Sequence, residues 1–95
     1  MLRLAAMAST FARAKTTMYV GRAREALGEL AEAEAAFRKN LELARALHAE
    51  FPQDVELEDN MAIALNDLGR VLRLSGKPAE AEPLAVGTQA LQLRR

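Results

Sequence analysis

The residues that could do chemistry are few, and their spacing does not assemble a catalytic site. The 95-residue chain has one histidine, His48, and no cysteine, so thiol chemistry, disulfides and thiolate metal sites are excluded. With no second histidine beside it, we interpret His48 as a residue at the edge of an apolar helix face. The acids Glu32 with Glu34, and Glu80 with Glu82, are two residues apart and splay around a helix. We predict that the protein is not an enzyme and holds no cofactor and no metal.

A row of polar and cationic side chains follows residues 66–73. Asn66, Arg70 and Arg73 recur at steps of four and three, nearly opposite the apolar positions of the same stretch, which places them on an exposed helix face. Lys15 and Arg22 would extend this face in the first part of the chain. Guanidinium groups bind carboxylates by charge-assisted hydrogen bonds, so the face would suit an acidic peptide or a chain-terminal carboxylate.

A second interpretation of these charges stays open. Asp59, Asp67 and Glu25 are available as partners for the same cations. In that case the row consists of solvated surface pairs, which usually contribute little.

Composition indicates an all-α chain. Half of the residues are apolar, only 4% are aromatic, and 27% are charged, a balance that favours helices. The net charge is zero, although residues 1–24 carry five Lys and Arg and no acid. Residues 55–75 hold acids beside their two arginines, which argues against nucleic-acid binding, and no apolar run approaches the ~20 residues that span a membrane. We therefore expect a cytoplasmic protein.

Apolar positions at steps of three and four predict four helices, at 7–27, 30–51, 55–75 and from Pro78 to near the end, with residues 1–6 frayed. Gly28 and Gly76 would end the first and third helices, and Asp54 would cap the start of the third. Short connections make consecutive helices antiparallel. The predicted apolar stripes are Leu30, Ala33, Phe37, Leu41, Ala44, Leu47 and Phe51; Leu57, Met61, Leu65, Leu68 and Leu72; and Ala81, Leu84, Ala85, Thr88 and Leu91.

The chain repeats itself at a distance of 48 residues. Comparison of residues 13–43 with 61–91 gives nine identities, which include Gly21 with Gly69 and Gly28 with Gly76. A glycine inside a helix costs about 1 kcal/mol relative to alanine. We therefore expect Gly69 to lie where a neighbouring helix comes close.

These residues resemble the tetratricopeptide repeats (TPRs). Leu68-Gly69, Leu72, Gly76, Ala81 and Ala85 match the small and large positions of one whole unit, and Gly21, Gly28, Ala33 and Phe37 match a second. The period is longer than the usual 34 residues, as in the long-helix variants of bacterial multi-repeat proteins and kinesin light chains. The resemblance implies one domain over residues 1–95, a short α-solenoid of antiparallel hairpins with units at about 7–51 and 55–95.

The resemblance also implies a non-catalytic scaffold that binds a peptide or partner protein in a concave groove lined by the first helix of each unit. The candidate groove residues are Lys15, Met18, Arg22, Asn66, Arg70 and Arg73. Two repeats are fewer than a self-standing solenoid usually needs. The alternative is therefore a structural piece, either a self-associating bundle or part of a larger repeat array.

An apolar stripe at Met7, Phe11, Ala14 and Met18 leaves three explanations open. It is ordinary core if the helix is rotated from the expected register. Otherwise it contacts an apolar partner helix, or a second copy of this chain, since methionine-rich surfaces adapt to varied partners.

Overall fold

The computed structural model describes residues 2–93, including their side chains except at positions 2, 88, 92 and 93. This part of the chain forms four helices and no strand: α1 (Leu2–Ala26), α2 (Leu30–Glu50), α3 (Val55–Leu74) and α4 (Pro78–Leu93). The all-α prediction and the four helices are confirmed. The prediction that residues 1–6 fray is wrong for residues 2–6, which belong to α1; Met1 lies outside the described residues.

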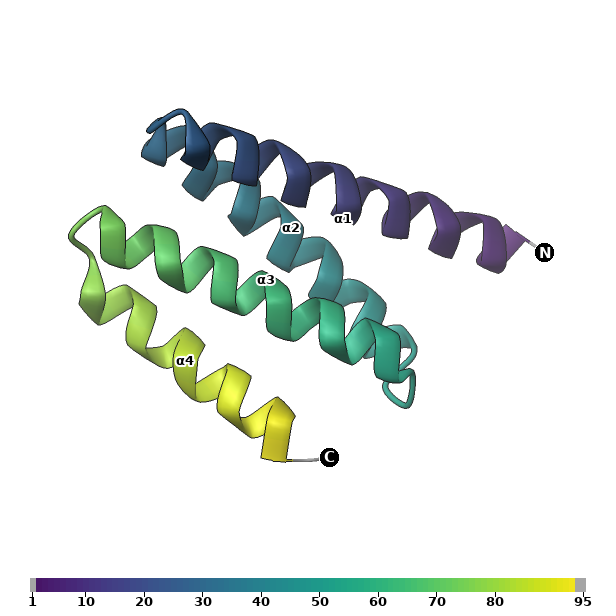
Figure 1. Cartoon of the computed structure of the whole chain (residues 1–95). Coiled ribbons are helices and arrows are strands. Elements are labelled where there is room, and N and C mark those ends of the chain that lie inside the picture. The colour runs from purple at the N-terminus through teal and green to yellow at the C-terminus, as the bar shows by residue number, and fades with distance from the viewer. Residues whose placement is uncertain (1, 94–95) are drawn as a thin grey trace.

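Each helix packs against the next one along the chain. Figure 1 shows α1 and α3 running in the same direction, with α2 and α4 returning antiparallel to them. The Cα atoms span 43 × 28 × 15 Å, so the helices form a thin slab. Because the slab is thin, every helix keeps an exposed side on which a partner can bind.

Glycines end the first and third helices. Gly28 and Gly76 have φ of +79° and +76°, the left-handed region that glycine adopts without steric penalty. The Glu29 N–H donates to the Arg24 carbonyl at 2.9 Å, and the Lys77 N–H donates to the Leu72 carbonyl at 2.8 Å. Both are the bonds of a Schellman motif, which satisfies carbonyls at the helix end.

Asp54 starts α3 as its sequence position predicts. Its side chain accepts a hydrogen bond from the Leu57 N–H at 3.2 Å. This bond satisfies one of the backbone donors that the first helical turn leaves unpaired.

The hydrophobic core lies along α2 and α3 and reaches α4. Its largest fully buried side chains are Phe37, Leu68, Val71 and Leu72, and the cluster continues through Leu41, Ala44, Ala64, Leu65, Ala81 and Leu91. The predicted stripes therefore form the core, except that Ala85 is exposed. The side chain of Thr88 lies outside the described ones.

Gly69 does not lie against a neighbouring helix, so that prediction is wrong. A β-carbon at Gly69 would meet only Nη1 of Arg73, at 3.5 Å, an ordinary contact. A β-carbon at Gly21 would lie 2.5 Å from the Phe37 ring. The two glycines differ because the position of Phe37, shifted by 48 residues, holds the smaller and exposed Ala85.

Candidate functional site

Two rows of side chains meet where α1 lies beside α3. The rows follow helical steps of three and four: Phe11, Lys15, Met18, Arg22 and Glu25 on α1, and Asn60, Ile63, Asp67 and Arg70 on α3. The C-terminal part of each row is charged and forms ion pairs. The N-terminal part is mostly apolar and lines a pocket.

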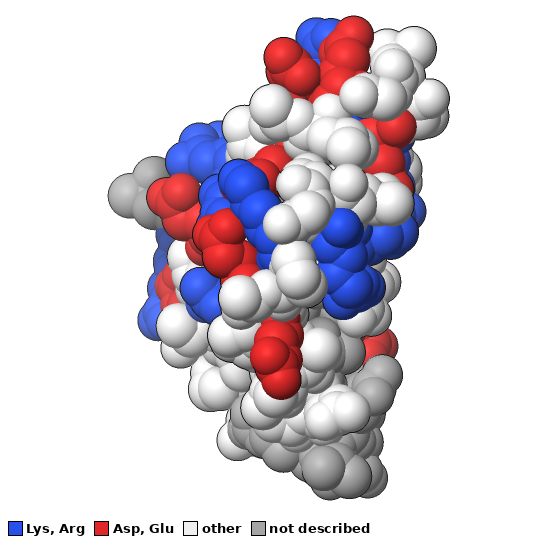
Figure 2. Space-filling model, turned by 90° about the vertical axis from the view of Figure 1, so that its left-hand side faces the viewer, with Lys and Arg blue, Asp and Glu red and all other residues white. Residues whose placement is uncertain are grey.

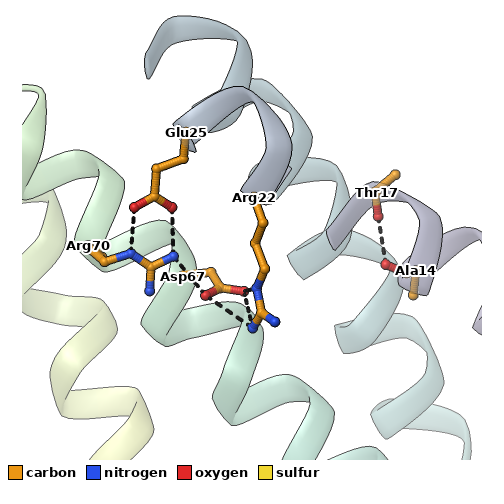
Figure 3. Close-up of polar contacts among 6 residues, drawn as sticks. All are labelled: Ala14, Thr17, Arg22, Glu25, Asp67 and Arg70. Carbon is orange, nitrogen blue, oxygen red and sulfur yellow. Dashed lines mark hydrogen bonds and ion pairs between the residues drawn. The ribbon is translucent and has the colours of Figure 1, made fainter. Parts of the chain in front are cut away.

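The charged part is a network of two arginines and two carboxylates (Figure 3). Arg70 donates from Nε and Nη2 to the carboxylate of Glu25, at 2.8 and 2.7 Å, a bidentate pair between α3 and α1. Arg70 also donates to Asp67 at 3.0 Å. Arg22 donates from Nη2 to Asp67 at 3.1 Å, so the buried carboxylate of Asp67 joins both arginines.

Each group in the bidentate pair favours the charged form of the other. The hydrogen bond from Arg70 lowers the pKa of Glu25, against the opposing effect of burial. The same bond, with a smaller contribution from Asp67, raises the pKa of Arg70. Two cations and two anions leave the network without net charge, and an acidic ligand would have to compete with Glu25 and Asp67 for these arginines.

Thr17 and Arg24 stand where the second hairpin has Leu65 and Leu72. The Thr17 hydroxyl donates back to the Ala14 carbonyl at 2.9 Å (Figure 3), and Arg24 forms an ion pair with Glu29. Both side chains are therefore satisfied locally and take no part in a core.

The pocket lies beyond the network, between α1 and α3 and over α2. It encloses about 380 Å³ of space between atoms, including the solvent at its mouth. The α2 residues are almost fully buried, so they form its floor. The lining consists of Phe11, Ala14, Lys15 and Met18 from α1, Asn40, Ala44 and Leu47 from α2, and Leu57, Asn60 and Ile63 from α3.

The six candidate residues fall into three places. Lys15 and Met18 line the pocket. Arg22 and Arg70 belong to the ion-pair network with Glu25 and Asp67, which is the alternative that the sequence left open. Asn66 and Arg73 are exposed on α3 and line neither the pocket nor the network. Their role in binding stays a prediction.

The apolar stripe of α1 serves both the core and the pocket. Ala14 is buried, whereas Met7, Phe11 and Met18 are half-buried. Phe11 and Met18 line the pocket wall, and the ammonium of Lys15 lies 5.4 Å from the centre of the Phe11 ring. The stripe therefore borders the pocket and is only partly core.

Sequence reasoning missed Asn40, Asn60 and Ile63 as pocket residues. One signal was available for Asn40, which lies three residues after Phe37 and four before Ala44. That spacing puts a polar amide on the apolar side of the helix.

The end of the molecule that carries the two glycine turns shows charges of both signs. Figure 2 shows Lys and Arg beside Asp and Glu over this face, without a patch of one sign. The pairs Lys77–Glu34 and Arg38–Glu80, at 3.2 and 3.4 Å, link α2 with α4 there. This face therefore offers no field that would attract a strongly charged partner.

The described residues contain no cluster of three or more metal-binding side chains. His48 is half-buried, and its Nε2 has no hydrogen-bond partner within the described part of the chain. No helix of the described residues has the length and apolarity needed to cross a membrane.

Residues 61–95 match the model of a protein family described as a tetratricopeptide repeat. This stretch begins within α3 and includes all of α4, so the second hairpin is a tetratricopeptide repeat, and the predicted resemblance is confirmed there. Neither the search of curated proteins nor the search of solved structures found a match. The fold is a short all-α solenoid of this kind, and repeats of this family generally mediate contacts between proteins.

Proposed function

We propose that the chain is a non-catalytic cytoplasmic scaffold that binds a peptide or partner protein in the groove between α1 and α3. The pocket carries this proposal, because it is the place where side chains from three helices leave an apolar space that opens to solvent. A partner side chain that fills it would gain roughly 25 cal/mol for each Å² of apolar surface removed from water.

The ion-pair network has a supporting role in this proposal. It joins α1 to α3 across 45 residues of sequence, and thereby fixes the separation of the two groove walls. Lys15 and Arg73 remain as cations for an acidic partner, because neither forms an ion pair within the described residues.

The test compares two partly exposed apolar residues that receive the same charge. Ile63 is 39% exposed at the pocket, and Val86 is 60% exposed on α4. Peptides are selected from a random display library against the wild-type chain, and their dissociation constants are measured with Ile63→Glu and Val86→Glu. We expect Ile63→Glu to weaken binding at least about tenfold, because the carboxylate is desolvated against the ligand, and Val86→Glu to leave it unchanged.

Sedimentation velocity on the same variants separates binding from assembly. A wild-type oligomer that Val86→Glu dissociates, together with peptide binding that ignores Ile63→Glu, would favour the assembly alternative. A folded Ile63→Glu variant that binds the selected peptides as tightly as wild type contradicts the groove proposal.

A further inference from the structure

Asn40 is a buried amide that lacks a partner. It is 5% exposed and lies on the floor of the pocket. Within the described part of the chain no residue makes a hydrogen bond with its side chain. An amide buried without a hydrogen bond destabilises the fold, so its position on an apolar helix face needs a reason.

The pocket gives this amide a place to bind something. Asn60 and Lys15 also line it, from opposite walls, so polar groups from three helices converge on a space with otherwise apolar walls. This is the usual composition of a binding site, in which apolar surface provides affinity and a few polar groups set specificity.

The size of the space limits its occupant to one side chain. About 380 Å³, counted with the solvent at the mouth, is near the lower end of the range for pockets that hold small molecules. The walls of Phe11, Met18 and Ile63 lie opposite one another across α2, which leaves a narrow space that favours an unbranched chain.

We propose that this pocket binds a glutamine side chain of the partner, with its carboxamide paired to the amide of Asn40. The inference rests on the proposed groove function and names the group that the groove selects. A carboxamide has both an acceptor and donors, as Asn40 has, so two such groups form a pair of complementary hydrogen bonds. The two methylenes of glutamine pack against the apolar walls.

Two side chains of similar length would bind less well. Methionine fills the same space but leaves Asn40 unpaired. Glutamate would bring a charge to a buried floor, where desolvation opposes it, although Lys15 at the wall partly offsets this penalty.

The test uses acetyl-Ala-Gln-Ala-amide and its Met and Glu counterparts as probes, titrated into the ¹⁵N-labelled chain. The side-chain amide resonances of Asn40 are identified by their absence in Asn40→Ala, which removes the amide without blocking the pocket. We expect the glutamine peptide to shift these resonances and to bind about fivefold more tightly than the methionine peptide, which corresponds to one net hydrogen bond. In Asn40→Ala that preference should vanish.

Gln53→Ala removes an exposed amide from the turn between α2 and α3 and is the control, which should keep the preference. Equal binding of the Gln and Met peptides, a preference for Glu, or no saturable shift at Asn40 up to the solubility limit overturns the inference. If peptides selected for the groove lose affinity with Ile63→Glu but not with Asn40→Ala, the groove function stands and the glutamine pocket fails.

Discussion

At the scale of single residues, the two helical glycines show that equivalent positions can have different physical roles. Gly21 leaves room for the ring of Phe37, which is fully buried. Gly69 faces only the flexible end of Arg73. The first glycine is required by packing, and the second has the conformational cost of glycine without that benefit.

We therefore predict opposite effects of the same substitution. Gly69→Ala should raise the free energy of unfolding by about 0.5–1 kcal/mol, the difference in helix propensity. Gly21→Ala should lower it by about 1–3 kcal/mol, because overpacking against a fully buried ring exceeds the gain in propensity. Urea denaturation followed by circular dichroism measures both. Changes of the same sign would contradict the contrast between the two sites.

Glu25 predicts a dependence of stability on pH. Its pKa is lowered from the ordinary 4.5, first by the hydrogen bond from Arg70, so the unfolded chain binds a proton more readily than the folded chain as pH falls. The stabilisation from Glu25 is complete above the ordinary pKa and is lost as pH falls through the folded value.

Wild type should consequently lose stability from about pH 5 to about pH 3 more steeply than Glu25→Gln. Thermal melts across this range check the expectation. Glu42→Gln, at a side chain that is 70% exposed, serves as the control and should follow wild type. Parallel curves for wild type and Glu25→Gln would show that the pair with Arg70 adds nothing to stability.

At the scale of the helices, α4 contains a structural conflict. Pro83 lies inside it, yet the helix continues from Pro78 to Leu93. Proline removes one backbone hydrogen bond and crowds the preceding turn. Because Pro83 is exposed, its ring adds little packing that would offset this cost.

Pro83→Ala should therefore raise the free energy of unfolding by about 1–3 kcal/mol. Amide hydrogen exchange should slow in α4 more than in α1. Pro52→Ala, in the turn before α3, is the matched control and should slightly lower stability, because it frees the unfolded chain. Unchanged exchange in α4 would show that the helix already accommodates proline.

The helices were predictable from sequence because their signals are local. Gly28, Gly76 and Asp54 act within a few residues of the helix ends that they fix. The start of α1 was missed because its ties are distant. Arg3 pairs with Glu50 at 2.6 Å and lies over the Phe51 ring, contacts that no local pattern reveals.

At the scale of the whole molecule, α3 connects the two hairpins. It packs against α2 on one side and α4 on the other, and Leu68 is almost fully buried in that core. Loss of packing at this position should therefore affect both hairpins together.

Leu68→Ala should lower the free energy of unfolding by about 2–5 kcal/mol and should speed hydrogen exchange in α1 as well as in α4. Leu74→Ala, at a side chain that is 58% exposed, should change stability by less than about 0.5 kcal/mol. A Leu68→Ala chain in which only α4 loses protection would mean that the hairpins fold independently.

The candidate site was less predictable than the fold for a reason that also belongs to this scale. Arg22 and Arg70 were visible as cations, but their carboxylate partners are on another helix, 45 residues away. Asn40 became a pocket residue only when α1 and α3 lay beside each other over α2. Helical spacing gives the face of a residue, whereas the rotation of one helix against another decides what that face meets.

The two turn glycines have a stereochemical consequence. Gly28 and Gly76 have φ near +80°, and nothing lies within 4 Å of the position a β-carbon would take. The mirror-image residue D-alanine prefers this backbone region, so a chemically synthesised chain with D-alanine at both turns should restrict the unfolded state and leave the folded one undisturbed. L-Alanine at the same positions would meet the left-handed penalty of about 1–2 kcal/mol each, so the handedness of two atoms should decide whether the hairpins tighten or loosen.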